Sequence, residues 1–319
     1  MRIVLAVLLA AFLPALAEAQ TYPAKPIRIV VPWAPGGSTD VLARLIGVKM
    51  AENWGQPAVV ENKPGASGNI GSDLVAKAPA DGYTLLLGSV STHAMNPFLM
   101  PSMPFKGVDD FTTIALAAYV TNVLVTHPSV PAKSVPELID LLKAQPGKIA
   151  YASAGNGSPN HIAAELFCRL AGVEMLHVPY ANSGQALKDV QSGEVPIYFT
   201  FLGPIDGMLR SGQLKALAVV SDRRIRAWPD IPTVSELGFK DAAASPWNGV
   251  LAPAGTPPEI VNRLYWEFAR IVELPDVKDR FAQMGMEPIA TSPERFSAEI
   301  REAVVRWPPI VKAAGIRPE

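Results

Sequence analysis

Two glycine-rich turns, one in each half of the chain, constrain most strongly what this sequence can fold into. Each lies between a strand-like run and a helix-like run, the first within residues 27–40 and the second within residues 148–161. Such a turn presents free backbone N–H groups where a helix begins and carries partial positive charge, which is the physical requirement for holding an anion. One turn of this kind is common. Two of them predict two lobes that grip one ligand between them.

Strand and helix signals alternate along the chain, which predicts an α/β fold with mostly parallel sheets. Strands are expected at residues 27–31, 58–61, 83–88, 113–119, 123–126, 149–152, 176–179, 195–201, 214–220 and 247–252. Helices are expected at residues 40–53, 69–78, 159–171, 184–191, 258–272, 276–284 and 293–314, with a further one opening at Ser134. Ser38 or Thr39 is available as the N-cap of the first helix. Pro308 and Pro309 are expected to kink or break the last helix.

The N-terminal residues have the pattern of a secretion signal. Arg2 supplies one positive charge, an apolar run follows to Ala17, and Ala17-Glu18-Ala19 is a small-x-small cleavage pattern. The apolar run is too short for a spanning helix, which needs about 20 residues. We therefore expect a signal peptide over residues 1–19, cleavage after Ala19 and a periplasmic protein. The alternative is a buried N-terminal helix.

Composition excludes some partners. The chain has 319 residues and a formal net charge of −1. Because no basic stripe is present to neutralise phosphates, nucleic acid is not expected as a partner. Cys168 is the only cysteine and falls in an apolar helical run, so it is expected to be a small core residue.

Motifs along the whole mature chain make the sequence resemble the periplasmic solute receptors of tripartite tricarboxylate transporters, the Bug family. The early matches are YPAKPIRIVVPW at 22–33, PGGSTD at 35–40, VENKPGA at 60–66, GNIG at 68–71 and DGYTLLL at 81–87. The later matches are YASAGNGS at 151–158, His161, Glu165, VPY at 178–180, Pro232, Thr233, Glu236, Gly238, Trp247 and APAGTP at 252–257. Their order is specific, although a single motif such as Gly-Asn-Gly would be weak alone.

The resemblance implies an α/β fold of the two-lobed periplasmic-binding-protein type (type II-like), each lobe a mostly parallel sheet flanked by helices. Lobe 1 is expected at residues 20–123 plus 247–319, and lobe 2 at residues 124–246. The implied function is a non-enzymatic receptor that captures a small carboxylate between the lobes. It would deliver this ligand to a membrane transporter with two integral subunits. No cofactor is implied, and a monomer is expected.

The resemblance also implies which loops hold the ligand. In the family a ligand carboxylate is bound by loop backbone groups and ordered water. Carried onto this chain, the first lobe contributes Ala34, Pro35, Gly36, Gly37, Ser38, Asp40, Ser89, Thr92 and His93. The second lobe contributes Ser153, Ala154, Gly155, Asn156, Gly157, Ser158, His161 and Thr200. Asp40 is also interpreted as a carboxylate that braces the first helix turn, and His161 as a residue that shapes the cleft.

Two departures from the family pattern concern the ligand. Ala181 and Asn182 stand where the family usually has Lys-Gly, and Thr200 stands where it commonly has Asp. Which carboxylate is bound therefore does not carry over from a relative. The missing acid at Thr200 weakens the case for an amino-acid ligand, whose ammonium group would need a carboxylate partner.

Other functions fit the residues less well. A dinucleotide fingerprint would need a third glycine where Asn160 stands, and neither turn has the Gly-Lys-Ser/Thr of a phosphate-binding loop. His161 and Glu165 share a helix face, but no second histidine lies nearby in sequence to complete a metal site. His127 and His177 are interpreted as loop and strand-edge residues without a function. No G-x-S-x-G nucleophile motif is present. A receptor that signals to a membrane sensor remains the alternative to transport.

Overall fold

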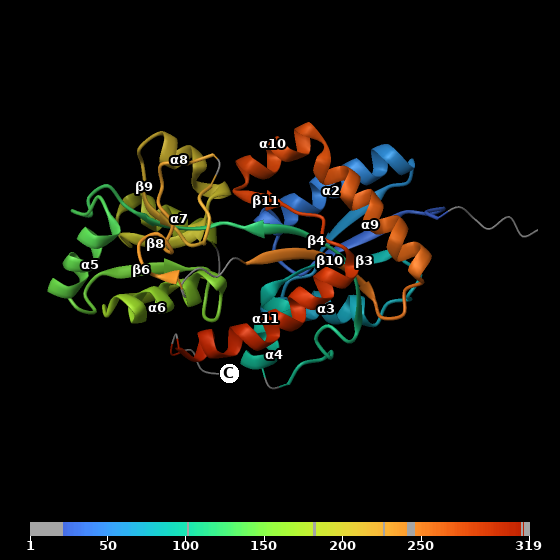
Figure 1. Cartoon of the computed structure of the whole chain (residues 1–319), viewed down its shortest axis with the longest axis horizontal. Helices are drawn as coiled ribbons and strands as arrows, with labels where there is room; N and C mark the ends of the chain where they lie inside the picture. The colour runs from blue at the N-terminus through green and yellow to red at the C-terminus, as the bar shows by residue number, and fades with distance from the viewer. Residues whose placement is uncertain are drawn as a thin grey trace, which may run out of the picture.

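The computed structural model describes residues 22–100, 102–180, 183–225, 227–240, 246–313 and 315. Within these residues the chain forms two α/β lobes that lie side by side, each built on its own sheet (Figure 1). The predicted signal peptide and its cleavage site lie outside the described residues.

The sheet of the first lobe has six strands in the order β11-β4-β10-β3-β1-β2. The strands are β1 (Ile27–Val31), β2 (Ala58–Asn62), β3 (Thr84–Ser89), β4 (Phe111–Val120), β10 (Trp247–Pro253) and β11 (Met286–Pro288). β1 runs parallel to both β2 and β3, whereas β10 is antiparallel to β3 and β4, and β11 is antiparallel to β4. The helices of this lobe are α2 (Ser38–Trp54), α3 (Asn69–Ala76), α4 (Asn96–Leu99), α9 (Pro258–Glu273), α10 (Pro275–Gln283) and α11 (Pro293–Ala313).

The sheet of the second lobe has five strands in the order β7-β6-β8-β5-β9. They are β5 (Asn122–Thr126), β6 (Ala150–Ser153), β7 (Leu176–Pro179), β8 (Ile197–Phe201) and β9 (Lys215–Val219). β6 is parallel to β7 and β8, and β5 is antiparallel to β8 and β9. The helices are α5 (Val135–Ala144), α6 (Pro159–Ala171), α7 (Ser183–Ser192) and α8 (Asp206–Arg210).

Each sheet has an apolar core on both of its faces. Along β1, Ile29 lies in one buried cluster of the first lobe and Val30 in the other. Along β8, Phe199 and Tyr198 divide in the same way between the two clusters of the second lobe. Successive side chains of a strand point to opposite faces, so a strand covered on both faces is apolar throughout. This explains the nearly continuous apolar runs that mark the strands in the sequence.

The lobes are joined where the chain passes from β4 into β5. The N–H of Thr121, between these strands, donates to Gly285 O at 3.0 Å, and Leu202 N donates to Thr121 O at 3.2 Å. The last turns of α11 also reach across, because Ile310 packs against apolar clusters of both lobes. In Figure 1 this end of α11 lies beneath the second lobe, next to α6.

Two expectations from the sequence need correction. The fold is α/β and two-lobed as predicted, but both sheets are mixed rather than mostly parallel, since β4, β5 and β10 connect the lobes and run antiparallel to their neighbours. Of the kink or break expected at Pro308 and Pro309, the break is wrong, because α11 continues to Ala313. Trp307 and Val311, on either side of the prolines, are fully buried and hold the last turns against the core.

Cys168 is a core residue, as predicted. It is 7% exposed, and burial raises the pKa of its thiol to about 12. Among the described residues, no helix is both long enough and apolar enough to cross a membrane.

Candidate functional site

The predicted ligand residues follow the carboxyl ends of strands in both lobes. In the first lobe they follow β1 and β3, which are parallel neighbours, and in the second lobe they follow β6 and end β8, which are also parallel neighbours. Ligands of open α/β sheets bind outside the carboxyl ends of the strands. A Cβ atom added to Gly157 of the second lobe would lie only 3.2 Å from Leu99 Cδ1 of the first lobe. The loop after β6 therefore touches the first lobe.

The loop after β1 is braced by Asp40. Its carboxylate is 3% exposed and accepts hydrogen bonds from Gly36 N at 3.0 Å, from Arg44 Nε at 3.1 Å and from Asn62 Nδ2 at 2.9 Å. Asn62 also donates to Trp33 O at 3.0 Å, so it ties the start of the loop to the same carboxylate. Burial alone would raise the pKa of Asp40, but the hydrogen bonds from Arg44, Gly36 and Asn62 outweigh it and lower the pKa. Asn62 falls within the family motif at 60–66, but its bracing role is not apparent from the sequence, because its partners Trp33 and Asp40 lie in the loop after β1 and in α2.

Gly37, and not Ser38 or Thr39, is the N-cap of α2. Its backbone is extended, with φ −73° and ψ 165°, and Val41 N donates to its carbonyl at 3.0 Å. Because α2 begins at Ser38, the N–H groups of its first turn have no helical acceptor. Ala34, Pro35, Gly36 and Gly37 are exposed, and Ser38 is half-buried. Within the part of the chain that the structure describes, the N–H groups of Gly37 and Ser38 have no hydrogen-bond partner, whereas Gly36 N donates to Asp40.

The segment after β3 lies under this loop. Ser89 is 7% exposed, and Thr92 and His93 are fully buried. Thr92 Oγ1 accepts from Ser89 N at 3.1 Å and lies 2.8 Å from His93 Nδ1. Burial lowers the pKa of His93 to about 4, so the imidazole is neutral at neutral pH. An added Cβ at Gly68 would meet Thr92 Cγ2 at 2.7 Å and Trp33 Cζ2 at 3.2 Å, which shows how closely these loops pack.

The loop after β6 directs its N–H groups in two directions. Gly155 N donates to Ser153 Oγ at 3.2 Å, and Gly157 N donates to His161 Nδ1 at 3.1 Å. Within the described chain, the N–H groups of Ala154 and Asn156 have no hydrogen-bond partner. Both glycines have positive φ, +107° and +69°, which produces the alternation. Of the backbone donors expected in this turn, those of Gly155 and Gly157 are therefore already engaged.

Ser158 is the N-cap of α6, and its hydroxyl accepts from His161 N at 3.2 Å. Thr200 lies on β8, is 5% exposed, and pairs in register with Val123. Close to it in the sheet, Asn122 is 1% exposed and its Oδ1 accepts from Asn160 Nδ2 at 3.3 Å. Asn122 is not among the residues predicted from the sequence. It is the first residue of β5, where the chain passes between the lobes, and neither strand nor helix periodicity distinguishes it.

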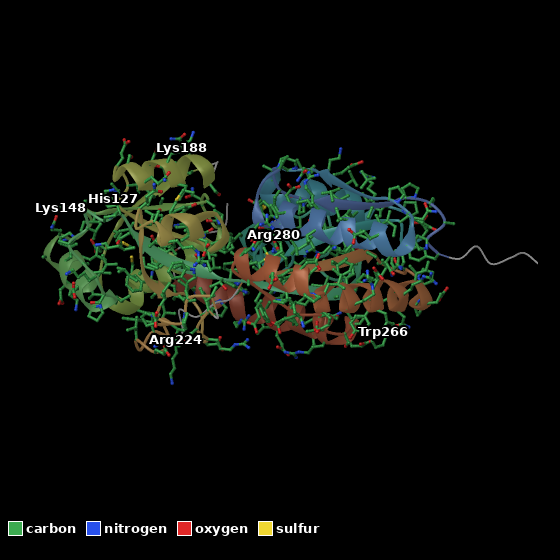
Figure 2. The ribbon with its side chains drawn as sticks, turned by 90° about the horizontal axis from the view of Figure 1, so that it is seen from above. His127, Lys148, Lys188, Arg224, Trp266 and Arg280 are labelled. Atoms are coloured by element: carbon green, nitrogen blue, oxygen red, sulfur yellow. The ribbon has the colours of Figure 1, made fainter. Side chains whose placement is uncertain are left out.

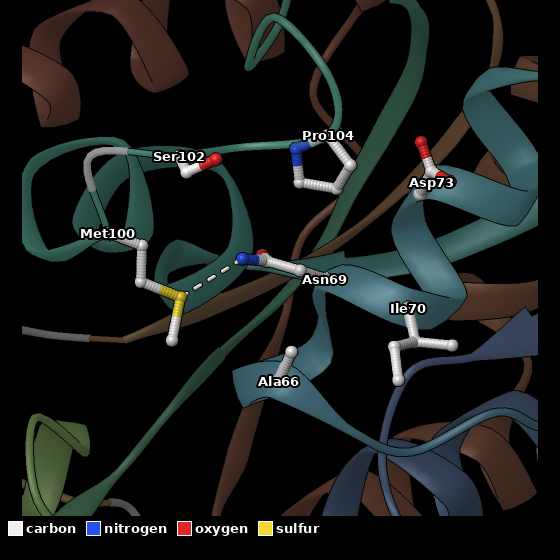
Figure 3. A pocket seen from close by; sticks show the side chains of 7 residues that line it. All are labelled: Ala66, Asn69, Ile70, Asp73, Met100, Ser102 and Pro104. Atoms are coloured by element: carbon white, nitrogen blue, oxygen red, sulfur yellow. Dashed lines mark hydrogen bonds between the residues drawn. The ribbon is translucent and has the colours of Figure 1, made fainter. Parts of the chain in front are cut away.

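Two hollows open on the first lobe. One, of about 550 Å³, lies between the start of α3 and residues 100–104, where Asn69 Nδ2 is 3.1 Å from Met100 Sδ (Figure 3). The other is lined by His93, by a group of residues that follow it and by two residues of α11: Pro97, Met100, Met103, Phe105, Lys106, Gly107, Val108, Asp109, Arg301 and Val304. Apart from His93, neither contains a residue predicted to bind the ligand.

No group of three or more metal-ligating side chains is assembled anywhere in the residues the structure describes. His161 Nε2 lies 4.0 Å from Glu165 Oε1, but Glu165 is engaged by the hydroxyl of Tyr151. His161 instead accepts a hydrogen bond from Gly157 N in the loop after β6, and Glu165 lies beside it on α6.

Comparison with known proteins places this arrangement in a family. The model of the tripartite tricarboxylate transporter family receptor matches residues 42–316. Protein BugT of Bordetella pertussis is 39% identical over 301 residues, which cover 94% of this chain and 92% of BugT. The chain belongs to this receptor family. It is therefore a periplasmic solute receptor of the tripartite tricarboxylate transporter type, and not an enzyme.

Solved structures agree with this assignment. Rpa4515 of R. palustris, solved with adipate, superposes with a TM-score of 0.87 at 35% identity over 93% of this chain and all of that one. MatC of Rhodopseudomonas palustris, with bound malate, gives a TM-score of 0.81 at 32% identity over 91% of this chain and all of that one. The methylphosphonate complex of PhnD1 from Prochlorococcus marinus, at 12% identity and a TM-score of 0.51, shares the two-lobed fold alone.

Proposed function

We propose that this receptor captures a small carboxylate between its two lobes, where backbone N–H groups of both glycine-rich loops hold the acid. The observation that carries the proposal is the paired loop architecture. Each loop follows the carboxyl end of a strand and precedes a helix, and each directs one set of N–H groups at buried braces and leaves another set open. Two relatives of similar fold were solved with the dicarboxylates adipate and malate.

The donors open to the ligand are few and neutral. In the first loop they are the N–H groups of Gly37 and Ser38, at the positive end of α2. In the second loop they are those of Ala154 and Asn156, with the start of α6 behind them. Five of the other predicted residues then act as braces: Asp40, Thr92 and His93 in the first lobe, and Ser153 and His161 in the second.

The lobe limits belong to the same proposal. The limits expected from the sequence are residues 20–123 plus 247–319 for lobe 1 and residues 124–246 for lobe 2. Because β5 (Asn122–Thr126) pairs within the second sheet, we move the first limit to between residues 121 and 122, and the chain still crosses twice between the lobes. A ligand that touches both lobes favours the closed arrangement by its differential affinity for that arrangement. Two integral membrane subunits would then bind the closed monomer. The mature receptor would be produced by cleavage of the signal peptide after Ala19.

Gly37 offers a sharp test. An added Cβ there meets only Ala34 O, at an ordinary 3.7 Å, and the extended backbone accepts any side chain. Gly37→Val should therefore fold, at a cost of about 1 kcal/mol for the poorer N-cap. Its side chain would obstruct the open N–H groups, so the stabilisation of the protein by adipate or malate should be lost.

Gly207→Val is the matched control, because Gly207 is exposed on α8 with nothing within 4 Å of an added Cβ. Thermal shift with mono-, di- and tricarboxylates, sugars and amines is measured for wild type and both variants. If only sugars, cations or amines stabilise the wild type, the ligand class is wrong. If Gly37→Val binds the acid as the wild type does, the first loop is not part of the site.

A further inference from the structure

Two histidine rings are stacked beneath the loop after β6. The imidazoles of His161 on α6 and His177 on β7 have centroids 3.9 Å apart and planes inclined by 6°. On the far side of His177, the ring of Tyr151 stacks at 4.9 Å and 19°. His161 is 9% exposed and His177 is half-buried. Hydrogen-bond partners determine which nitrogen of each stacked imidazole carries a proton. Here those partners lie at the end of β6 and in the loop that follows it.

Each imidazole is linked to one glycine of the loop. His177 Nε2 lies 2.7 Å from Ser153 Oγ, and that hydroxyl accepts from Gly155 N at 3.2 Å. His161 Nδ1 accepts from Gly157 N at 3.1 Å. The stack therefore turns both glycine N–H groups inward, and the N–H groups between them, on Ala154 and Asn156, are the ones left for a ligand.

The bond from Gly157 requires a neutral His161. An imidazole nitrogen that accepts a hydrogen bond carries no proton. Protonation of His161 at Nδ1 would place its new N–H against the N–H of Gly157, and the hydrogen bond would be lost. The titratable groups that face His161 are His177 and Glu165. Tyr151 donates a hydrogen bond to Glu165, and Cys168 lies about two helical turns beyond His161 along α6. Burial and the neighbouring His177 lower the pKa of His161 to about 3, and burial also lowers the pKa of His177.

We propose that His177 is a positioning residue for the ligand loop: it holds Gly155 through Ser153 and keeps His161 in the form that holds Gly157. This inference rests on the proposed function and names a residue that the sequence alone marked as a strand-edge residue. It predicts a receptor whose second loop stays in its binding arrangement when the pH falls well below the ordinary pKa of histidine, which is about 6.5.

Three variants test the role of His177. His177→Phe keeps the stacked ring but loses the link to Ser153, whereas a glutamine amide in His177→Gln can still hydrogen-bond the hydroxyl. His127→Phe is the control, because His127 lies at the outer end of the second lobe and contacts Ser129 (Figure 2). Adipate and malate affinities are measured by calorimetry. Loss of one supporting hydrogen bond should weaken binding about tenfold in His177→Phe, and glutamine should restore most of it.

Ligand-free readouts distinguish this inference from the proposed function. In the full-length mature protein, the amide resonance of Gly155 should shift in His177→Phe and not in His127→Phe. The imidazole of His161, freed from its neighbour, should titrate at higher pH in His177→Phe than in wild type. A merely structural role would leave this titration unchanged.

If the Gly155 resonance and the His161 titration are the same in wild type and His177→Phe, the positioning role is overturned. If they change as expected while no carboxylate binds the wild type, the positioning role stands and the proposed ligand class fails.

Discussion

Replacing Asp40 with asparagine tests whether the first ligand loop is held by a buried carboxylate. Each oxygen of the buried Asp40 carboxylate accepts one hydrogen bond from outside α2, from Gly36 N at 3.0 Å or from Asn62 Nδ2 at 2.9 Å, and each also meets the guanidinium of Arg44. An asparagine must direct its NH₂ group at one of these donors. In Asp40→Asn, one donor therefore loses its acceptor whichever way the amide is turned.

The expected cost follows from that count. Loss of a hydrogen bond to a charged group costs about 1.5–3 kcal/mol, whereas the pair with Arg44 adds little, because the Arg44 side chain is 53% exposed. We expect Asp40→Asn to lower the free energy of unfolding by about 2 kcal/mol, measured by urea denaturation at neutral pH. Glu52→Gln on the same helix is the control, since Glu52 is 58% exposed and its pair with Lys49 should be worth about 0.5 kcal/mol or less.

The pH dependence gives this prediction a second readout. Because the folded pKa of Asp40 lies below its ordinary value, its stabilising effect is present above the unfolded pKa of about 4. It is lost as the pH falls through the folded pKa, so the stabilities of wild type and Asp40→Asn should converge in acid. If Asp40→Asn is as stable as wild type at neutral pH, the carboxylate does not brace the loop and the reasoning fails.

Three further predictions concern single residues. Ser158→Ala should cost about 1 kcal/mol in urea denaturation through loss of the α6 N-cap, and an unchanged midpoint would contradict that cap. His93 should lower the free energy of unfolding of the wild type by about 3 kcal/mol as the pH falls from 6.5 to about 4. In this range His93 is protonated in the unfolded chain but stays neutral in the folded protein, where burial lowers its pKa. His93→Gln should flatten this part of the pH profile, and an equally steep slope in the variant would refute it. The thiol of Cys168 should react with a disulfide reagent only after unfolding, and rapid labelling of the native protein would show that it is not buried.

The sequence was informative where local chemistry decides the structure. The strand Ile27–Val31 and the helix Pro159–Ala171 were predicted to the residue, because an apolar run and a Ser-Pro helix start leave few alternatives. The three-residue strand β11 was not predicted, since three residues show no alternation. Residues 91–95 form a buried π-helical turn. The local sequence pattern does not predict it, because the turn depends on contacts with neighbouring loops.

The candidate site divides in the same way. The two glycine-rich loops could be found from their composition, but which of their N–H groups face outward could not. That depends on Asn62, which reaches Asp40 from 22 residues away, and on His177, which reaches Ser153 from 24 residues away. Tertiary contacts therefore decide which backbone donors of the two loops have no partner within the described chain.

Calorimetric titration of the wild-type mature protein with adipate and malate, at low and at high salt, tests the central claim most directly. Neutral backbone donors at two helix starts predict a dissociation constant of about micromolar, near −8 kcal/mol, for at least one small carboxylate. They also predict an affinity that changes little with salt, because no exposed ion pair dominates the contact. No carboxylate binding across a panel in which a sugar or an amine binds tightly would contradict the account.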